Sequence, residues 1–93
     1  MLQSFIRTTG EGLAEIRDAI SKGKMEYAAD IAHKIQPPCR HLGARELSTL
    51  LNKIENNIRS KTDTGAVSEL TQNALKEFGI LSRLIDDLIL KFN

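Results

Sequence analysis

Apolar residues recur every three, four or seven positions along most of the chain, which is the spacing of one face of an α-helix. The first stripe predicts a helix from Leu2 to Ile20, followed by a Ser-Lys-Gly stretch whose glycine is typical of a helix C-terminus. A second stripe predicts a helix from about Lys24 to Gln36. Its apolar positions are Met25, Ala28, Ile31, Ala32 and Ile35.

Two adjacent prolines interrupt the second helical pattern. Pro37 has no N–H group to donate to the carbonyl of His33, so we expect the helix to kink or stop there. A third helix is predicted after the corner formed by residues 42–44, and its pattern fades at Ser60. Its inward positions are Leu47, Leu50, Leu51, Ile54 and Ile58.

The polar, glycine-terminated stretch from Lys61 to Gly65 is the clearest linker, and Thr64 is a candidate N-cap for the last helix. That helix has a heptad-like apolar pattern. Its inward positions are Val67, Leu70, Ala74, Phe78, Leu81, Ile85, Leu88 and Phe92. Four amphipathic helices with short connections predict an all-α fold, an antiparallel up-and-down four-helix bundle.

The length of 93 residues allows one domain, residues 1–93, with a single core. Aromatic residues make up only 4% of the chain, while Leu, Ile and Ala supply most of the apolar bulk, which favours packed helices over a β-sandwich. The methionine at position 1 does not establish a natural start, because an excised domain carries one too. The chain is therefore compatible with being a piece of a larger protein.

Charge and composition exclude several classes of function. The 13 basic and 12 acidic residues give a net charge of +1 with no basic stripe, so we expect no nucleic-acid binding. A single cysteine forms no internal disulfide, and no apolar run approaches the roughly 20 residues of a membrane span. We expect a cytoplasmic, monomeric domain without membrane contact.

The most distinctive chemistry lies around His33. At about 100° per residue, this histidine points roughly 140° away from the centre of the second apolar stripe and should face solvent. Its expected neighbours on the outward face are Glu26, Ala29, Asp30, Gln36, Pro37 and Arg40. A neutral, exposed imidazole is a competent nucleophile. From periodicity alone, however, the favoured interpretation is that His33 is one more polar residue on a solvated face.

The stretch Ala32-His33-Lys34-Ile35, followed by Leu42-Gly43-Ala44 and Leu47, resembles the signature of histidine-containing phosphotransfer (HPt) domains. Gly43 lies ten residues after His33, which is the spacing of that family. The resemblance covers roughly the first sixty residues. The paired prolines are similar to those in HPt domains at the carboxyl ends of hybrid sensor histidine kinases, which implies such a parent protein.

The chain departs from the family pattern at two positions. Gln36 and Pro37 stand where the family usually has lysine and glycine, three and four residues after the histidine. The family lysine lies beside the phosphoryl group. In its absence, either Lys34 or Arg40 supplies positive charge there or the phosphoryl group is stabilised more weakly.

The resemblance implies a phosphorelay intermediate, a phosphohistidine carrier without kinase activity of its own. His33 would accept a phosphoryl group from a receiver-domain phosphoaspartate and pass it to another response-regulator receiver. Its implied binding shell contains Ala29, Asp30, Lys34, Gln36, Pro37 and Arg40. The receiver would supply Mg²⁺, so this chain would need no cofactor or metal.

Other readings remain open. His41 is a second candidate phosphoacceptor, although packing or capping at the start of the next helix suits it better. Cys39 and the two histidines do not indicate a zinc site, because the chain has no fourth ligand of Cys or His type. The pair Asp86-Asp87 fits a solvated helix face. Arg40 and Arg45 flank the corner at residues 42–44, where they either steer an acidic receiver surface or stabilise the corner itself. A helical scaffold, or an HPt-like module that binds receivers without phosphotransfer, is the alternative function. An autonomous helical enzyme lacks a second catalytic group near His33.

Overall fold

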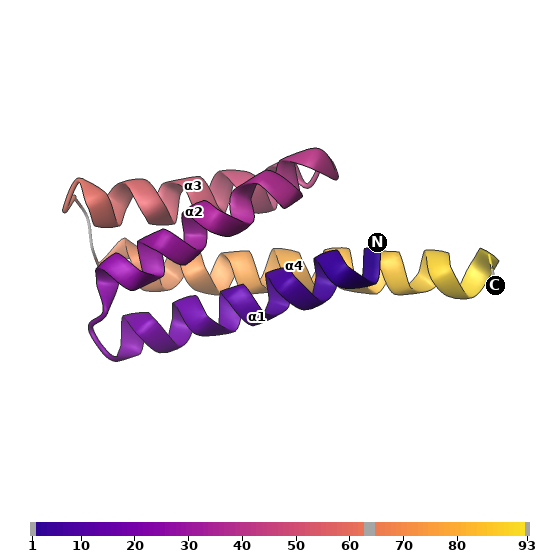
Figure 1. The fold of residues 1–93 in the computed structure, drawn as a ribbon, viewed down its shortest axis with the longest axis horizontal. Coiled ribbons are helices and arrows are strands. Elements are labelled where there is room, and N and C mark those ends of the chain that lie inside the picture. Colours follow the sequence, from indigo (N-terminus) through magenta and orange to yellow (C-terminus); the bar gives the residue numbers. More distant parts are fainter. Residues whose placement is uncertain (1, 63–64, 93) are drawn as a thin grey trace.

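The computed structural model describes residues 2–62 and 65–92 and contains the four-helix bundle expected from the sequence. The helices are α1 (Leu2–Ser21), α2 (Met25–His41), α3 (Arg45–Arg59) and α4 (Ala66–Phe92). Figure 1 shows them running alternately up and down, with α4 extending beyond the other three at its C-terminal end. Each helix packs against the next and α4 packs against α1, whereas the described residues of α2 and α4 make no close contact.

The predicted stripes form the core where neighbouring helices meet. Buried apolar side chains from all four helices pack together. The larger residues of this core are Phe5, Leu13, Ile16, Ile31, Ile35, Leu47, Leu51, Ile54, Ile58, Val67 and Ile85. Leu88 was predicted to face inward, but it is about half exposed because α4 continues past the helices that would cover it. The expected cap Thr64 and the side chains of Leu2 and Phe92 lie outside the described residues.

The first two turns have the same capping geometry. Gly23 and Gly43 adopt φ values of 75° and 78°, a left-handed conformation that glycine tolerates without a Cβ clash. After α1, the amide of Lys24 donates to the carbonyl of Ala19 at 2.8 Å. After α2, the amide of Ala44 donates to the carbonyl of Cys39 at 2.9 Å. These bonds satisfy terminal carbonyls and reverse the chain within three residues, which places successive helices side by side.

The sequence predicted a kink or a stop of the second helix at the prolines. The prediction of a stop is wrong, because α2 continues through Pro37 and Pro38 to His41. Proline fits helical φ values, but each proline removes one backbone hydrogen bond and its ring crowds the carbonyl four residues earlier. The last turn is held instead by Cys39, which is fully buried in the core, and by the capping bonds that follow it. Tertiary packing thus compensates for the missing backbone hydrogen bonds.

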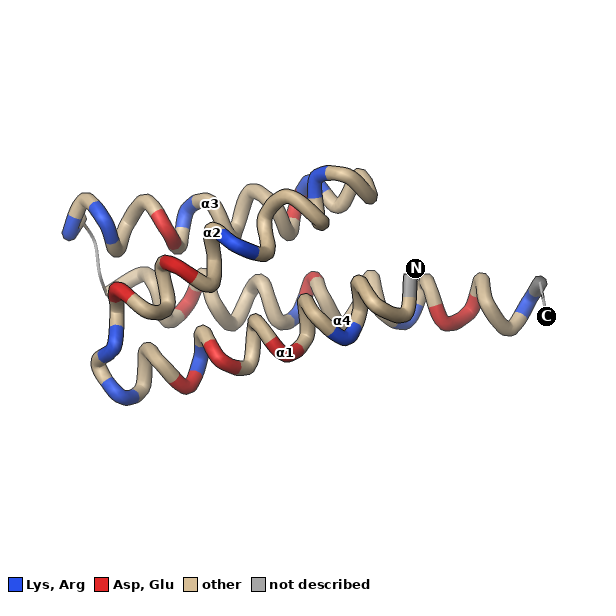
Figure 2. Tube along the Cα trace, viewed as in Figure 1, with Lys and Arg blue, Asp and Glu red and all other residues tan. Residues whose placement is uncertain are grey.

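Within the described residues, no helix is both long enough and apolar enough to span a lipid bilayer. Charged positions are also mixed in sign: Figure 2 shows Lys and Arg interspersed with Asp and Glu along the helices. Among the described residues, no helix therefore carries charges of one sign only.

Two glycines inside helices should respond oppositely to alanine. A Cβ at Gly12 would lie 3.0 Å from Cγ2 of the buried Ile35, whereas a Cβ at Gly79 would have no neighbouring atom within 4 Å. We expect Gly79→Ala to raise the free energy of unfolding by about 1 kcal/mol through helix propensity. We expect Gly12→Ala to lower it by about 1 kcal/mol, because overpacking outweighs that gain. Urea denaturation of dilute protein measures both; a Gly12→Ala variant as stable as Gly79→Ala would contradict the close α1–α2 packing.

Candidate functional site

His33 lies on the outer side of α2, where it faces α3 with one edge of its ring. Its side chain is 71% exposed, which confirms the predicted outward orientation. The Nδ1 atom lies 3.0 Å from Oε2 and 3.2 Å from Oε1 of Glu55 on α3. Since Nδ1 faces this carboxylate, the Nε2 edge of the ring is turned away from it.

Glu55 is a buried carboxylate surrounded by hydrogen-bond donors. Nε of Arg59 donates to Oε2 at 2.9 Å and Nε2 of Gln36 donates to Oε1 at 2.9 Å. Burial by itself raises the pKa of Glu55, but the hydrogen bonds from Arg59, Gln36 and His33 outweigh it and hold the pKa below its ordinary value of 4.5. The group is therefore ionised at neutral pH.

The charge of Glu55 determines the tautomer of His33. An ionised carboxylate only accepts hydrogen bonds, so the proton of a neutral imidazole must sit on Nδ1 when the two groups are bonded. The lone pair then resides on Nε2, the nitrogen turned away from Glu55. This arrangement presents a nucleophilic nitrogen to an approaching partner.

Arg59 extends the network from α3 back to α2. Besides Glu55, its guanidinium contacts Asp30 at 3.0 Å and Glu26 at 3.5 Å. Asp30 and Glu26 lie on the same side of α2 as His33. The guanidinium therefore helps to hold the α2–α3 pair at the spacing that brings Nδ1 to Glu55.

Four predicted members of the binding shell are not buried. Asp30, Lys34, Pro37 and Arg40 are exposed, as the helical geometry predicted. Because α2 remains helical through the prolines, Arg40 stays on the face of His33 two turns further along. The face thus combines an acidic residue before the histidine with basic residues after it.

The expectation that Ala29 and Gln36 are exposed is wrong. Ala29 is fully buried and Gln36 is only 5% exposed. The physical reason is that α2 packs against both α1 and α3, which widens its buried arc beyond the apolar stripe. Gln36 binds Glu55 as described, and its Oε1 lies 3.4 Å from Nδ2 of Asn52 on α3. It therefore supports the site from beneath.

Sequence reasoning missed Glu55 and Arg59. No local motif marks either residue, because both reach α2 only after α3 has packed against it. One signal was present: Glu55 follows Leu47 and Leu51 at intervals of four and so continues an inward row of α3. A carboxylate in such a row needs buried donors, which would have prompted a search for its partners.

The remaining candidate groups lie apart from this network. Cys39 is buried in the core, and burial raises the pKa of its thiol to about 11, so the group is a neutral packing residue at physiological pH. His41 is exposed at the end of α2, and Asp86 and Asp87 are exposed on α4. The described residues include no group of three or more Cys, His, Asp or Glu side chains placed to hold a metal ion.

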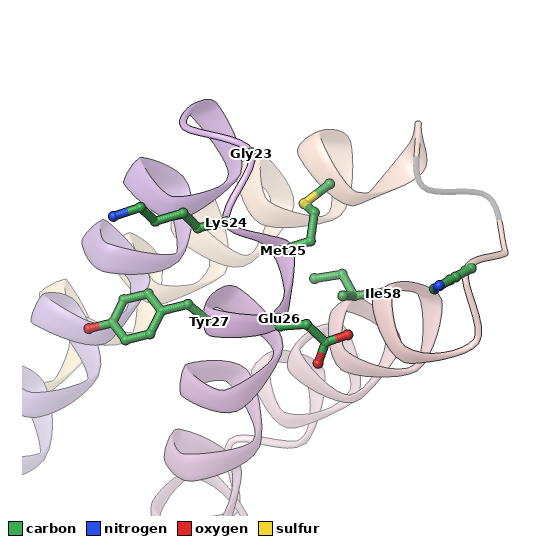
Figure 3. Close-up of a pocket in the computed structure, with 7 residues that line it drawn as sticks. Gly23, Lys24, Met25, Glu26, Tyr27 and Ile58 are labelled. Atoms are coloured by element: carbon green, nitrogen blue, oxygen red, sulfur yellow. The ribbon is translucent and has the colours of Figure 1, made fainter.

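A cavity of about 690 Å³ lies beside the turn between α1 and α2, and His33 is not among its lining residues. Figure 3 shows that Lys24 and Tyr27 extend to one side of the turn while Glu26 points elsewhere. A small-molecule site normally has polar groups that converge on the ligand. This hollow lacks that arrangement, so the network around His33 remains the candidate site.

The lowered pKa of Glu55 predicts a pH-dependent stability. A carboxyl group with a depressed folded-state pKa contributes stability above its unfolded-state pKa and loses that contribution as the pH falls through the folded-state value. We therefore expect the free energy of unfolding to fall as the pH drops below about 4.5. Glu55→Gln should show a shallower fall than the wild type in urea denaturations at matched pH values. Parallel curves would contradict the charged network.

Comparison with known families gives one match, to the family described as Hpt domain, over residues 1–89. Comparison with curated proteins and with solved structures gives no significant match. The family match covers nearly the whole chain, including all the residues around His33. The chain therefore belongs to the Hpt domain family, whose members act in phosphotransfer of two-component signalling as phosphohistidine carriers rather than kinases.

Proposed function

We propose that this domain is a phosphorelay intermediate in which His33 accepts a phosphoryl group from the phosphoaspartate of one receiver domain and passes it to another. The observation that carries this proposal is the contact between Nδ1 of His33 and the buried, ionised Glu55. It holds the ring by one nitrogen and leaves the other available in an otherwise exposed side chain.

The transfer step follows from this tautomer. Nε2 attacks the phosphorus atom of the phosphoaspartate, the N–P bond forms, and the P–O bond to the aspartate breaks to release its carboxylate. The imidazole keeps its Nδ1 proton and becomes a positively charged phosphoimidazolium. Glu55 accepts the hydrogen bond from that proton and stabilises the new positive charge. Reversal of the step on a second receiver completes the relay.

The docking face comprises His33 and the four exposed neighbours Asp30, Lys34, Pro37 and Arg40. Lys34 and Arg40 are exposed basic residues on α2 that would attract the anionic phosphoryl group, a role that Gln36 cannot take while its amide donates to Glu55. Pro37 leaves the carbonyl of His33 without a helical donor, which offers the partner an acceptor beside the histidine. The receiver domain supplies the Mg²⁺ ion for the transfer. In this proposal the domain acts as a relay in the cytoplasm.

The relay itself can be tested with isolated components. A receiver domain carrying a labelled phosphoryl group is mixed with the wild-type chain, and a second receiver is then added. We expect the label to appear first on the chain, in an acid-labile and base-stable form, and then on the second receiver. Receivers drawn from the genome that encodes the chain provide the panel. In a second experiment, the chain is first phosphorylated by a small labelled donor and then mixed with each receiver. If the label is lost only by hydrolysis and no receiver becomes labelled, the relay role is wrong.

A further inference from the structure

Arg59 and His33 share one acceptor atom. Nε of Arg59 lies 2.9 Å from Oε2 of Glu55, and Nδ1 of His33 lies 3.0 Å from the same oxygen. The two groups are therefore neighbours on one carboxylate, although only the guanidinium is charged at every ordinary pH. A carboxylate favours a second proton on an adjacent imidazole, because the opposite charges attract. A fixed positive charge on the same oxygen opposes that second proton.

Glu55 does not require a charged histidine. A buried carboxylate needs hydrogen-bond donors on its oxygens. Gln36 donates to Oε1 at 2.9 Å, and Arg59 donates to Oε2 and adds a full positive charge. A neutral imidazole that donates its Nδ1 proton completes this set. The carboxylate is therefore hydrogen-bonded and compensated in charge before the imidazole takes up a second proton.

Two further carboxylates, both on α2, contact the same guanidinium. It lies 3.0 Å from Asp30 and 3.5 Å from Glu26, and both side chains are largely exposed. Together with Glu55 they place three negative charges around one positive charge. Loss of that positive charge would leave His33 beside an excess of carboxylates, which favours the protonated ring.

The remaining charged groups around α2 do not replace Arg59. A hollow between α1 and α2, which His33 does not line, gathers the charged groups of that flank: Glu11, Glu15, Asp30 and Lys34. Arg40 is exposed two turns beyond His33, and α4 makes no close contact with α2 among the described residues. In the part of the chain that the structure describes, the guanidinium of Arg59 is the one permanent cation paired with Glu55.

We propose that Arg59 is a positioning residue for phosphotransfer, which keeps the His33 imidazole neutral by supplying the counter-charge of Glu55. The neutral ring carries the lone pair on Nε2 that attacks phosphorus, whereas a doubly protonated ring has none. Arg59 acts through Glu55 and not on the reacting nitrogen. The consequence for transfer rests on the proposed function, but the protonation of His33 is measured without any phosphoryl donor.

A nitrogen NMR titration of His33 tests the protonation directly. In Arg59→Gln, the pH at which half of the imidazole is protonated should rise by roughly half to one unit, because Glu55 loses its fixed counter-charge. Arg59→Lys keeps the charge and should restore most of the difference. Lys53→Gln removes a positive charge from an exposed position of the same helix and should leave the midpoint unchanged. An unchanged midpoint in an Arg59→Gln chain that circular dichroism shows to be folded would overturn the proposal.

Asp30→Asn tests the same charge balance in the opposite direction. Its side chain is 67% exposed, so the fold should tolerate the change. Removal of this carboxylate leaves the positive charge of Arg59 less compensated, and the titration midpoint of His33 should fall by roughly 0.2–0.5 unit. A midpoint equal to or above the wild-type value would contradict the proposal even if Arg59→Gln did not fold.

The pH dependence of phosphorylation by phosphoramidate links the protonation to transfer. At pH values below the titration, Arg59→Gln should react roughly three- to tenfold more slowly than the wild type, since a midpoint shift of half to one unit lowers the neutral fraction by that factor. Well above the titration, both rings are neutral and the variant should react at least as fast as the wild type. A purely structural role would slow the variant at every pH, and that result would overturn the proposal.

Failure of the proposed function gives a different result. A wild-type chain that gains no phosphoryl group from phosphoramidate or from a phosphorylated receiver would count against the relay. The NMR titrations would still decide whether Arg59 controls the protonation of His33.

Discussion

The His33→Gln variant will gain no phosphoryl group from phosphoramidate, whereas the wild type and His41→Gln will each gain one acid-labile group. The reaction needs a nucleophilic nitrogen with a free lone pair, and a glutamine amide has none. Glutamine retains an N–H group that can donate to Glu55 in place of Nδ1, so the α2–α3 contact has a substitute partner. The loss should therefore reflect missing chemistry and not a disrupted fold.

Intact mass measured before and after acid treatment reports the modification, and circular dichroism reports the fold. His41→Gln is the matched control, because His41 is the other histidine of the chain and lies exposed on the same helix. If His33→Gln still gains the phosphoryl group while His41→Gln does not, the acceptor is the wrong histidine. If no chain reacts even with phosphorylated receivers, the module binds partners without phosphotransfer.

The Glu55→Ala variant should accept a phosphoryl group roughly ten- to a hundredfold more slowly than the wild type, because the partner that orients a reactive histidine is removed. Without the carboxylate, the proton of the imidazole is no longer directed to Nδ1, and the cation formed on transfer loses its counter-charge. The variant should also lose about 1–3 kcal/mol of unfolding free energy, since the buried amide of Gln36 loses its acceptor.

Two further variants separate orientation from stability. Glu55→Gln keeps an oxygen that can accept the Nδ1 proton but carries no charge, so its rate should fall between those of the wild type and Glu55→Ala. Glu46→Ala makes the same deletion at an exposed position of α3 and should leave the rate unchanged. Nitrogen NMR shifts of His33 report its tautomer, which should become mixed when Glu55 is replaced by alanine and less strictly fixed in Glu55→Gln, whose amide also donates. Unchanged phosphorylation by a folded Glu55→Ala chain would show that this contact has no positioning role.

The helix count, the turns at Gly23 and Gly43 and the outward direction of His33 follow from the sequence because they are local properties. A stripe with a period near 3.6 fixes which side of a helix is apolar, and a glycine after it marks where a left-handed cap can form. These features need no knowledge of the neighbouring helix. The choice of His33 as the candidate nucleophile came instead from the resemblance of residues 32–47 to the HPt signature.

Tertiary structure decided the extent of α2 and the composition of the site beneath His33. Periodicity gives the direction of a face but not the number of helices that pack on it, so the burial of Ala29 and Gln36 follows only from α2 lying between α1 and α3. The prolines remove local hydrogen bonds, yet the buried Cys39 keeps the next turn helical. Glu55 meets His33 only because the packing of α3 against α2 closes a separation of 22 residues, a distance over which no local pattern carries information.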